Sequence, residues 1–377
     1  MPFIKESFQI HAPQRVIAFL RQILRISMKD AQRFVDKGRV EQNGEVVRDK
    51  TRVLQGEVSV SHFKAVDLGI APIFENADFA AFDKPAGLLS HPKGRFWHFS
   101  LLDAVRFHFG GGANLINRLD YETSGLVLAS KNKKSEAELK ALFENRAMEK
   151  TYLALVEGKV DSADLQNLGE KIQFKKPYKS FCSVWLLPKV ESHLSLNFNL
   201  PNNADFVIDL PIKEGKMGSD LGIRSRVCEG GKPAQTAVKI LHYDCRKNQT
   251  LLKVTPLTGR THQIRVHLAH IGHKIVGDGL YGVSDAKARE FLAQKAQNLD
   301  SANKNKKPCH SERSEESQNK NPPLRADSQN LHNPRCYNAI KSAESSAKSR
   351  LMLHAQSLRF CYKNKDYFIY APTARSF

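Results

Sequence analysis

The sequence predicts an α+β protein made of two domains, a small N-terminal α/β module over residues 1–64 and a larger domain over residues 65–377. Segments with strand patterns alternate with short amphipathic helices along most of the chain, which is typical of this fold class. The 377 residues leave room for two domains, and a hydrophobic content of 41% supports a buried core. No run of about 20 apolar residues is present that could span a bilayer.

The chain carries a large positive charge, because 58 lysines and arginines exceed 39 aspartates and glutamates and give a formal net charge of +19. Such a charge favours a polyanionic partner, with nucleic acid preferred over an anionic membrane surface. Solubility alone would need a smaller charge. The cysteines have neither zinc-site nor disulfide-framework spacing, and the N-terminus has no signal-peptide core. We therefore expect a cytoplasmic protein.

Residues 1–64 contain the capping and turn signals of a compact module. Pro13 is suited to open a helix, Ser27 is a good N-cap for a second helix, and Gly38 is suited to end it. Asn43-Gly44 between apolar residues is a strong signal for a two-residue hairpin turn. We expect two helices followed by a hairpin and a further strand.

Basic residues recur every four positions along the two predicted helices, and we call these five residues the basic stripe: Arg21, Arg25, Lys29, Arg33 and Lys37. Like charges at this spacing are neighbours and weaken an isolated helix by roughly 0.2–0.5 kcal/mol per pair. Phosphates would neutralise them, although an ordinary solvated face remains an alternative. The segment SMKDAQRFVDKGRVEQNG resembles the α-L RNA-binding motif of ribosomal and RNA-modifying proteins.

The larger domain shows strand patterns at 79–82, 150–158 and 251–256. Ser135 and Glu138 form a predicted capping box at the start of one helix. A second short helix follows residue 256, with apolar residues on one face and a glycine at its end.

Two stretches of this domain do not fit its pattern. Residues 159–207 are hard to assign and are interpreted as an insertion. Residues 283–349 are polar and charged beyond Phe291, so they cannot bury enough apolar surface to fold alone, and we expect a disordered insertion. The segment RLMLHA, from residue 350, resumes the composition of a core.

Several kinds of site are disfavoured by the motifs. The chain contains no phosphate-binding loop of the G-x-x-x-x-G-K-[ST] type, and FGGGAN lacks the context of a dinucleotide fingerprint. The histidines near residues 262–273 lack the companions that zinc sites require. We expect no metal and no cofactor, and phosphate or backbone contacts for these histidines.

Asp120 is the candidate for chemistry, because it interrupts an apolar run in INRLDYETSGLVLASKN. A partly desolvated carboxylate needs a nearby guanidinium to stay ionised. Arg118 would point to the opposite face of a regular strand, which leaves the distant Arg265 as a candidate partner. An oriented aspartate can act as a covalent nucleophile, but a purely structural ion pair is equally compatible with the residues alone.

Ordered motifs identify a family resemblance. The stretches DKPAGLLSHP, NRLDYETSGLVLASKN, KTYLALVEG, GKPAQT, TGRTHQIRVHLAHIGHKIVGDGLYG and RLMLHA resemble, in this order, those of pseudouridine synthases of the large-ribosomal-subunit family. The resemblance implies a mixed, largely antiparallel sheet and cofactor-free isomerisation of uridine to pseudouridine in structured RNA. It favours large-subunit rRNA as the target, with tRNA as an alternative, and implies no obligate protein partner.

The resemblance also implies roles for individual residues. Asp120 would attack the ribose or assist glycosidic cleavage, Tyr152 would stack on the base, and Arg265 would pair with the aspartate. Arg118 would fill the gap left by the flipped uridine, and Ile264 would pack below the base. Arg260 and His262 are expected to contact RNA.

One position departs from the family signature H-R-L-D-x-x-T-S-G, whose first residue is Asn117 here. Asparagine can donate and accept hydrogen bonds but does not titrate near neutral pH. If the position only supports the loop, activity is expected to survive; if it contacts substrate, target or rate would differ. A non-catalytic RNA-binding or ribosome-assembly factor is the alternative from another class.

Overall fold

The computed structural model describes residues 3–63, 67–92, 99–161, 183–186, 204–215, 221–304 and 350–373. The chain divides into two compact units, one made of Met1–Val66 with Pro92–Phe99 and the other of Asp67–His91 with Ser100–Phe377. Within the described ranges, no helix has the length and apolar character needed to cross a membrane.

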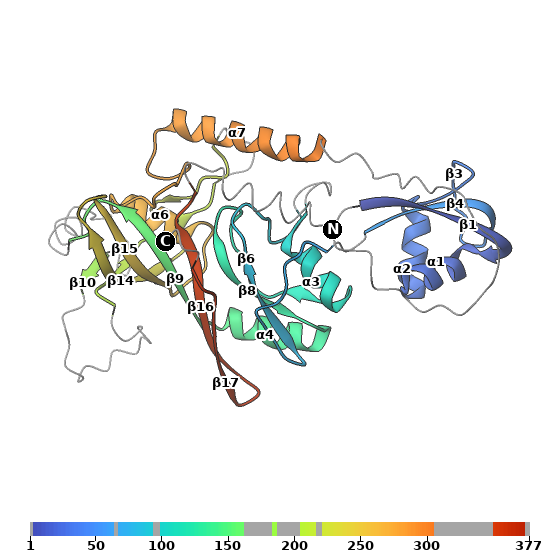
Figure 1. Cartoon of the computed structure of the whole chain (residues 1–377), viewed down its shortest axis with the longest axis horizontal. Helices are drawn as coiled ribbons and strands as arrows, with labels where there is room; N and C mark the ends of the chain where they lie inside the picture. Colours follow the sequence, from blue (N-terminus) through green and yellow to red (C-terminus); the bar gives the residue numbers. More distant parts are fainter. Residues whose placement is uncertain are drawn as a thin grey trace. The chain divides into compact units, whose positions relative to one another are not determined.

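The first unit combines a four-stranded antiparallel sheet with two helices (Figure 1). The sheet order is β1 (Phe3–Arg15), β4 (Val53–Phe63), β2 (Val40–Gln42) and β3 (Glu45–Val46). The helices α1 (Val16–Leu24) and α2 (Met28–Asp36) share one apolar core with these strands.

Most local signals in this unit are confirmed. The Ser27 hydroxyl accepts a hydrogen bond from the backbone N–H of Asp30 and caps α2. Asn43 and Gly44 have φ values of 52° and 84°, the left-handed conformation that a tight hairpin turn between β2 and β3 requires. The helix start predicted at Pro13 is wrong, because pairing of β1 with β4 continues to residue 15 after an irregularity that accommodates the proline.

The second unit is built on an 11-stranded sheet with strand order β10-β11-β14-β15-β9-β16-β8-β6-β5; β17 also pairs with β16, and β7 with β8 (Figure 1). The strands are β5 (Phe74–Glu75), β6 (Phe79–Lys84), β7 (Asn114–Leu115), β8 (Ser124–Ser130), β9 (Met148–Glu157), β10 (Ser183–Leu186), β11 (Phe206–Asp209), β14 (Gln235–Asp244), β15 (Gln249–Pro256), β16 (Leu353–Tyr362) and β17 (Lys365–Tyr370). A separate two-stranded ribbon pairs β12 (Ile212–Lys213) with β13 (Arg226–Val227). Among the described strands only β16 and β8 run parallel, which confirms the mixed, largely antiparallel sheet.

The parallel contact between β8 and β16 depends on a glycine. Gly125 has φ +109°, and a Cβ added there would lie 2.2 Å from the carbonyl oxygen of Ala355. A side chain would therefore separate the two strands that join the halves of the sheet. The loop that carries Asp120 enters β8 just before this contact.

The described helices of this unit are α3 (Leu101–Phe109), α4 (Lys133–Glu144), α6 (Gln263–His270) and α7 (Asp285–Lys304). The capping box predicted at Ser135 and Glu138 is wrong, because α4 begins earlier and is capped by the side chain of Asn132. The Glu138 carboxylate instead accepts a hydrogen bond from Tyr362 in β16.

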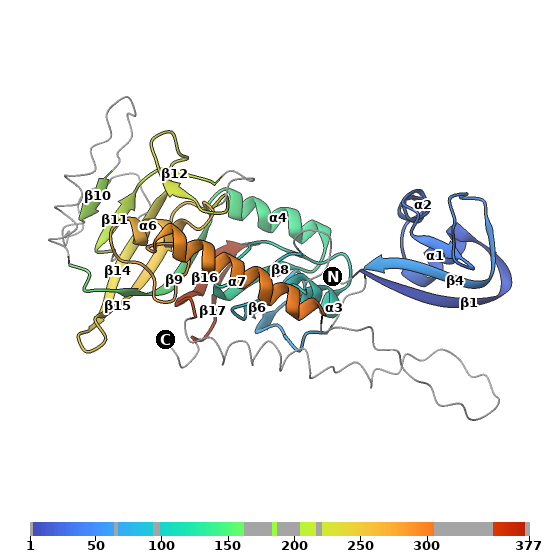
Figure 2. The ribbon, with the colours of Figure 1, turned by 90° about the horizontal axis from the view of Figure 1, so that it is seen from above.

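Helix α7 occupies the start of the segment expected to be a disordered insertion, and Figure 2 shows it running across the strands of the sheet. Its first turns are ordered by burial of Ala288 and by packing of Phe291 on the apolar cluster around α6. Residues 305–349 of that segment lie outside the described residues, as do 162–182 and 187–203 of the other expected insertion. Leu351, Met352 and Leu353 are buried, which confirms that the core resumes there.

Candidate active site

Asp120 lies in a loop that is fixed from both sides. Fully buried Lys84 donates hydrogen bonds to the carbonyl oxygens of residues 85 and 88 and, at 3.4 Å, to that of Tyr121. The Ser90 hydroxyl accepts from the N–H of the residue before Asp120 and donates to that residue's carbonyl. The carboxylate of Asp120 remains 30% exposed, so it is held in place and still accessible.

Asn117 supports this loop through strand β8. Its side-chain oxygen accepts a 2.7 Å hydrogen bond from the backbone N–H of Leu128, and its amide nitrogen donates to the carbonyl of Leu126. Asn117 as a whole is 5% exposed, so these bonds satisfy buried backbone groups. Arg118, the next residue, is exposed.

Arg265 projects from α6 towards Asp120 but has a stronger partner. Its Nε and Nη2 each donate a 2.8 Å hydrogen bond to the carboxylate of Asp278. The remaining nitrogen, Nη1, lies 3.6 Å from Asp120 Oδ2 and 3.6 Å from Glu122 Oε2. The structure thus brings together the two residues paired by the sequence prediction and adds Asp278 and Glu122. Asp278 was not among the site residues predicted from the sequence. The glycines on either side of it in the GDGLYG motif were the sequence signal that could have identified it.

The charges in this cluster stabilise one another. Burial alone would lower the pKa of Arg265, but hydrogen bonds to Asp278 and the charges of Asp120 and Glu122 raise it above its ordinary value. Burial would raise the pKa of Glu122, whereas Lys295 and Arg265 outweigh that effect and lower it. The guanidinium therefore stays cationic and Glu122 stays ionised near neutral pH.

His262 also faces Asp120, with Nε2 lying 3.7 Å from Oδ2. Its Nδ1 lies 2.8 Å from the hydroxyl of Tyr281, which accepts a hydrogen bond from the N–H of Ser225. Because that hydroxyl can donate its own proton to Nδ1, this arrangement favours the tautomer with the proton on Nε2, facing the carboxylate. Burial lowers the pKa of His262 and keeps the imidazole neutral.

Tyr152 lies in β9, between β15 and β16, opposite Val254 and Ala355. It packs against the apolar cluster that contains Ile264, whose side chain is 6% exposed. Burial, with a further contribution from Asp120, raises the pKa of the tyrosine, so it remains a neutral phenol.

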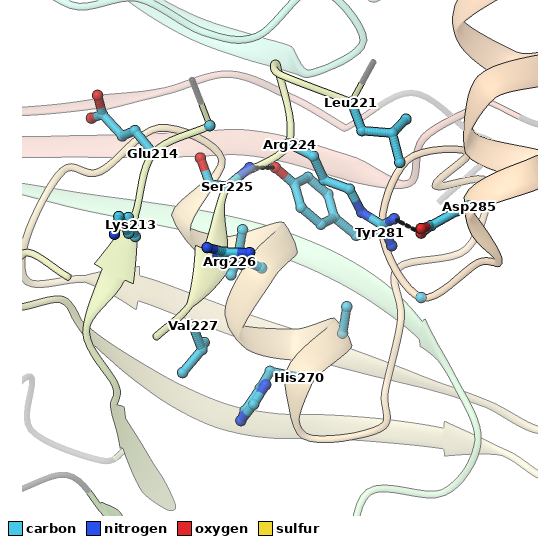
Figure 3. Close-up of a pocket in the computed structure, with 14 residues that line it drawn as sticks. Lys213, Glu214, Leu221, Arg224, Ser225, Arg226, Val227, His270, Tyr281 and Asp285 are labelled. Carbon is cyan, nitrogen blue, oxygen red and sulfur yellow. Dashed lines mark hydrogen bonds and ion pairs between the residues drawn. The ribbon is translucent and has the colours of Figure 1, made fainter. Parts of the chain in front are cut away.

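A cavity of about 720 Å³ adjoins this cluster (Figure 3). Tyr281 lines it, and Figure 3 shows the hydrogen bond between its hydroxyl and the backbone of Ser225. Lys213, Arg224 and Arg226 contribute basic groups to its lining. Glu214 and Asp285 contribute acidic groups, and Asp285 is ion-paired with Arg224, so the lining is mixed in charge. Tyr281 connects the cavity to the cluster, because its hydroxyl lies 2.8 Å from His262.

The other predicted RNA contacts lie elsewhere. All members of the basic stripe are exposed and belong to the first unit: Arg21, Arg25, Lys29, Arg33 and Lys37. Arg260 is half-buried, and its Nε donates to the carbonyl of Pro233 at the entrance to α6. His267 is fully buried between Thr236 and the carbonyl of Leu210, so it is a core residue.

Comparison with known proteins places this geometry in a family. Residues 78–270 match the model of RNA pseudouridylate synthase. An uncharacterized RNA pseudouridine synthase of Helicobacter pylori is 43% identical over 298 residues, which cover 79% of this chain and 87% of that protein. The ribosomal large subunit pseudouridine synthase D of Nitrosomonas europaea is 30% identical, covering 62% and 56% of the two chains. The tRNA pseudouridine(31) synthase of Saccharomyces cerevisiae is 29% identical, covering 56% and 46%. The chain therefore belongs to the RNA pseudouridylate synthase family of enzymes.

Proposed function

We propose that this enzyme isomerises uridine in structured RNA with Asp120 as its catalytic carboxylate. The observation that carries the proposal is the 3.6 Å approach of Arg265 Nη1 to Asp120, in a loop that is otherwise fixed by buried hydrogen bonds. The guanidinium places a positive charge beside the carboxylate and orients it, and 30% exposure leaves the carboxylate open to a ribose.

The neighbouring side chains suit the remaining steps. The uridine has to leave the helical stack, because a carboxylate cannot reach its sugar or ring there, and exposed Arg118 is available to occupy the gap. The Tyr152 ring offers a stacking surface on Ile264 and its apolar cluster. As a neutral phenol, Tyr152 can hydrogen-bond to the detached uracil while the base rotates to present carbon 5.

The proposed target is large-subunit rRNA, with tRNA as the second candidate. The Nitrosomonas relative is named for the large ribosomal subunit and the yeast relative for tRNA, so similarity alone supports both. The basic stripe on the first unit favours an extended RNA surface, since phosphate contacts supply affinity without sequence.

The test is tritium release from RNA labelled at carbon 5 of uracil, together with pseudouridine maps of rRNA and tRNA from cells carrying each variant. Asp120→Asn is expected to abolish release and to remove specific sites from the map. Asp78→Asn is the matched control, because Asp78 is 28% exposed and ion-paired with Lys363. Identical maps for the wild type and Asp120→Asn would overturn the proposed role. Sites lost from tRNA alone would assign the tRNA target.

A further inference from the structure

Helix α7 brings a lysine into the catalytic cluster. The Nζ of Lys295 forms an ion pair with Glu122 Oε1 and lies 4.7 Å from the ring centre of Tyr121. The helix is seated closely, because a Cβ added at Gly279 would lie 2.3 Å from the ring of Phe291, one turn before Lys295. Lys295 therefore reaches the loop of Asp120 from a segment whose sequence gave no sign of a catalytic role.

Glu122 and Asp120 compete for the same nitrogen of Arg265. Asp278 occupies two nitrogens of the Arg265 guanidinium, so only Nη1 faces the two remaining carboxylates. Nη1 lies equally far, 3.6 Å, from Asp120 and from Glu122. Two carboxylates that share one cationic group compete for it, and each disfavours the charge of the other.

We propose that Lys295 is a positioning residue that holds Glu122 by its second oxygen and so keeps Nη1 of Arg265 available to Asp120. The proposal rests on the proposed function of Asp120. Lys295 is 22% exposed and Glu122 is 18% exposed, so the pair is only partly screened by solvent. Lys295 acts on the reaction through Glu122 and Arg265, without touching the reacting atoms.

Loss of Lys295 would change the charges that surround both Glu122 and Asp120. Glu122 faces Lys295 and Arg265, so without the lysine it would rely on Nη1 alone. Asp120 faces Arg265, His262 and Tyr152, of which only the arginine is cationic near neutral pH. Asp120 would then lose the cationic group that orients it, and the rate of the chemical step would fall while RNA binding would not change.

The experiment measures kcat and KM by tritium release from carbon-5-labelled RNA. Lys295→Met keeps the aliphatic stem and is expected to lower kcat about tenfold and to leave KM unchanged. Lys295→Arg is expected to restore kcat. The matched control is Lys287→Met, an exposed lysine on the same helix, which is expected to behave as wild type.

The double variant with Glu122→Gln tests whether Lys295 acts through Glu122. In Glu122→Gln enzyme the competing charge is gone, so adding Lys295→Met is expected to cause no further change in kcat. An equal loss in both backgrounds would overturn the proposal. It would also be overturned by a raised, salt-dependent KM with an unchanged kcat, which would mean that Lys295 binds RNA phosphate directly. Full activity of Asp120→Asn would instead refute the proposed function.

Discussion

The side chains of Arg265 and Asp278 form an ion pair with two hydrogen bonds of 2.8 Å, and only 2% and 1% of these side chains are exposed. The same carboxylate accepts hydrogen bonds from the backbone N–H groups of Leu280 and Tyr281. Asp278 therefore fixes both Arg265 and the turn that leads to the Tyr281 ring.

Replacing Asp278 by asparagine is expected to destabilise the enzyme by about 3–5 kcal/mol, because it leaves the buried Arg265 charge without its main partner. Activity should fall as well, since the guanidinium loses its orientation towards Asp120. Denaturant unfolding and tritium release measure the two effects. Asp285→Asn is the control, because Asp285 pairs with Arg224 at 66% exposure and should change stability by no more than about 1 kcal/mol.

Asn117 is expected to matter for stability more than for chemistry. Asn117→Ala leaves the buried N–H of Leu128 without its acceptor and should cost about 1–3 kcal/mol. Asn117→His can provide one donor and one acceptor and should retain activity with an unchanged pH profile. Thermal unfolding and pH–rate curves provide the check. A pH–rate curve altered by Asn117→His would show instead that this position takes part in catalysis.

Gly125→Ala is expected to disrupt the junction between β8 and β16. The added Cβ would lie 2.2 Å from the carbonyl oxygen of Ala355, and the residue would keep a φ of +109°. Replacing a glycine by alanine stabilises a protein by up to about 1 kcal/mol where the backbone conformation is compatible, and destabilises it by more than that where it is not. Gly125→Ala should therefore lower the unfolding free energy by more than about 1 kcal/mol. Gly111→Ala, in a loop with no atom within 4 Å of the added carbon, is the control for expression and melting temperature. Equal melting temperatures would contradict this account of the junction.

Glu136 should make stability depend on pH in acid. Its carboxylate accepts hydrogen bonds from Lys140, Lys133 and Asn114, which outweigh burial and lower its pKa from 4.5 to about 2. A lowered native pKa means that the stabilisation is complete above about pH 4.5 and is lost as pH falls towards 2. Unfolding free energies of the wild type and Glu136→Gln should therefore differ at pH 6 and converge near pH 2. A constant difference would contradict the carboxylate's role.

The basic stripe is expected to bind phosphate groups. Replacing Arg21 and Lys29 by alanine should weaken RNA binding at low salt and reduce the slope of log affinity against log salt by about 1 for each contact removed. Lys50→Ala is the control, because its amine is already paired with Asp36 on the same unit. Filter binding between 50 and 200 mM salt, roughly the range over which counterion release is measurable, provides the slopes. Unchanged slopes would favour the solvated-face alternative.

Short sequence signals were enough to predict many local features of this structure, because helix caps, turns and motifs each depend on only a few neighbouring residues. Ser27 and Asn43-Gly44 were identified from such signals, and the motif around Asp120 indicated the family and the approach of Arg265. The signals failed where tertiary contacts outweighed them. Pairing of β1 with β4 extended a strand past Pro13.

The composition of the charged cluster around Arg265 was decided by tertiary structure. Asp278, Glu122 and Lys295 come from a loop after α6, the loop before β8 and a helix expected to be disordered, and no sequence spacing relates them. They meet because parallel contact at Gly125 and packing of Phe291 on Gly279 bring those segments to one buried guanidinium. The sequence by itself determined which residue types the chemistry uses, whereas the tertiary structure decided which charges compete for Arg265, since electrostatic partners depend on distance in space and on burial.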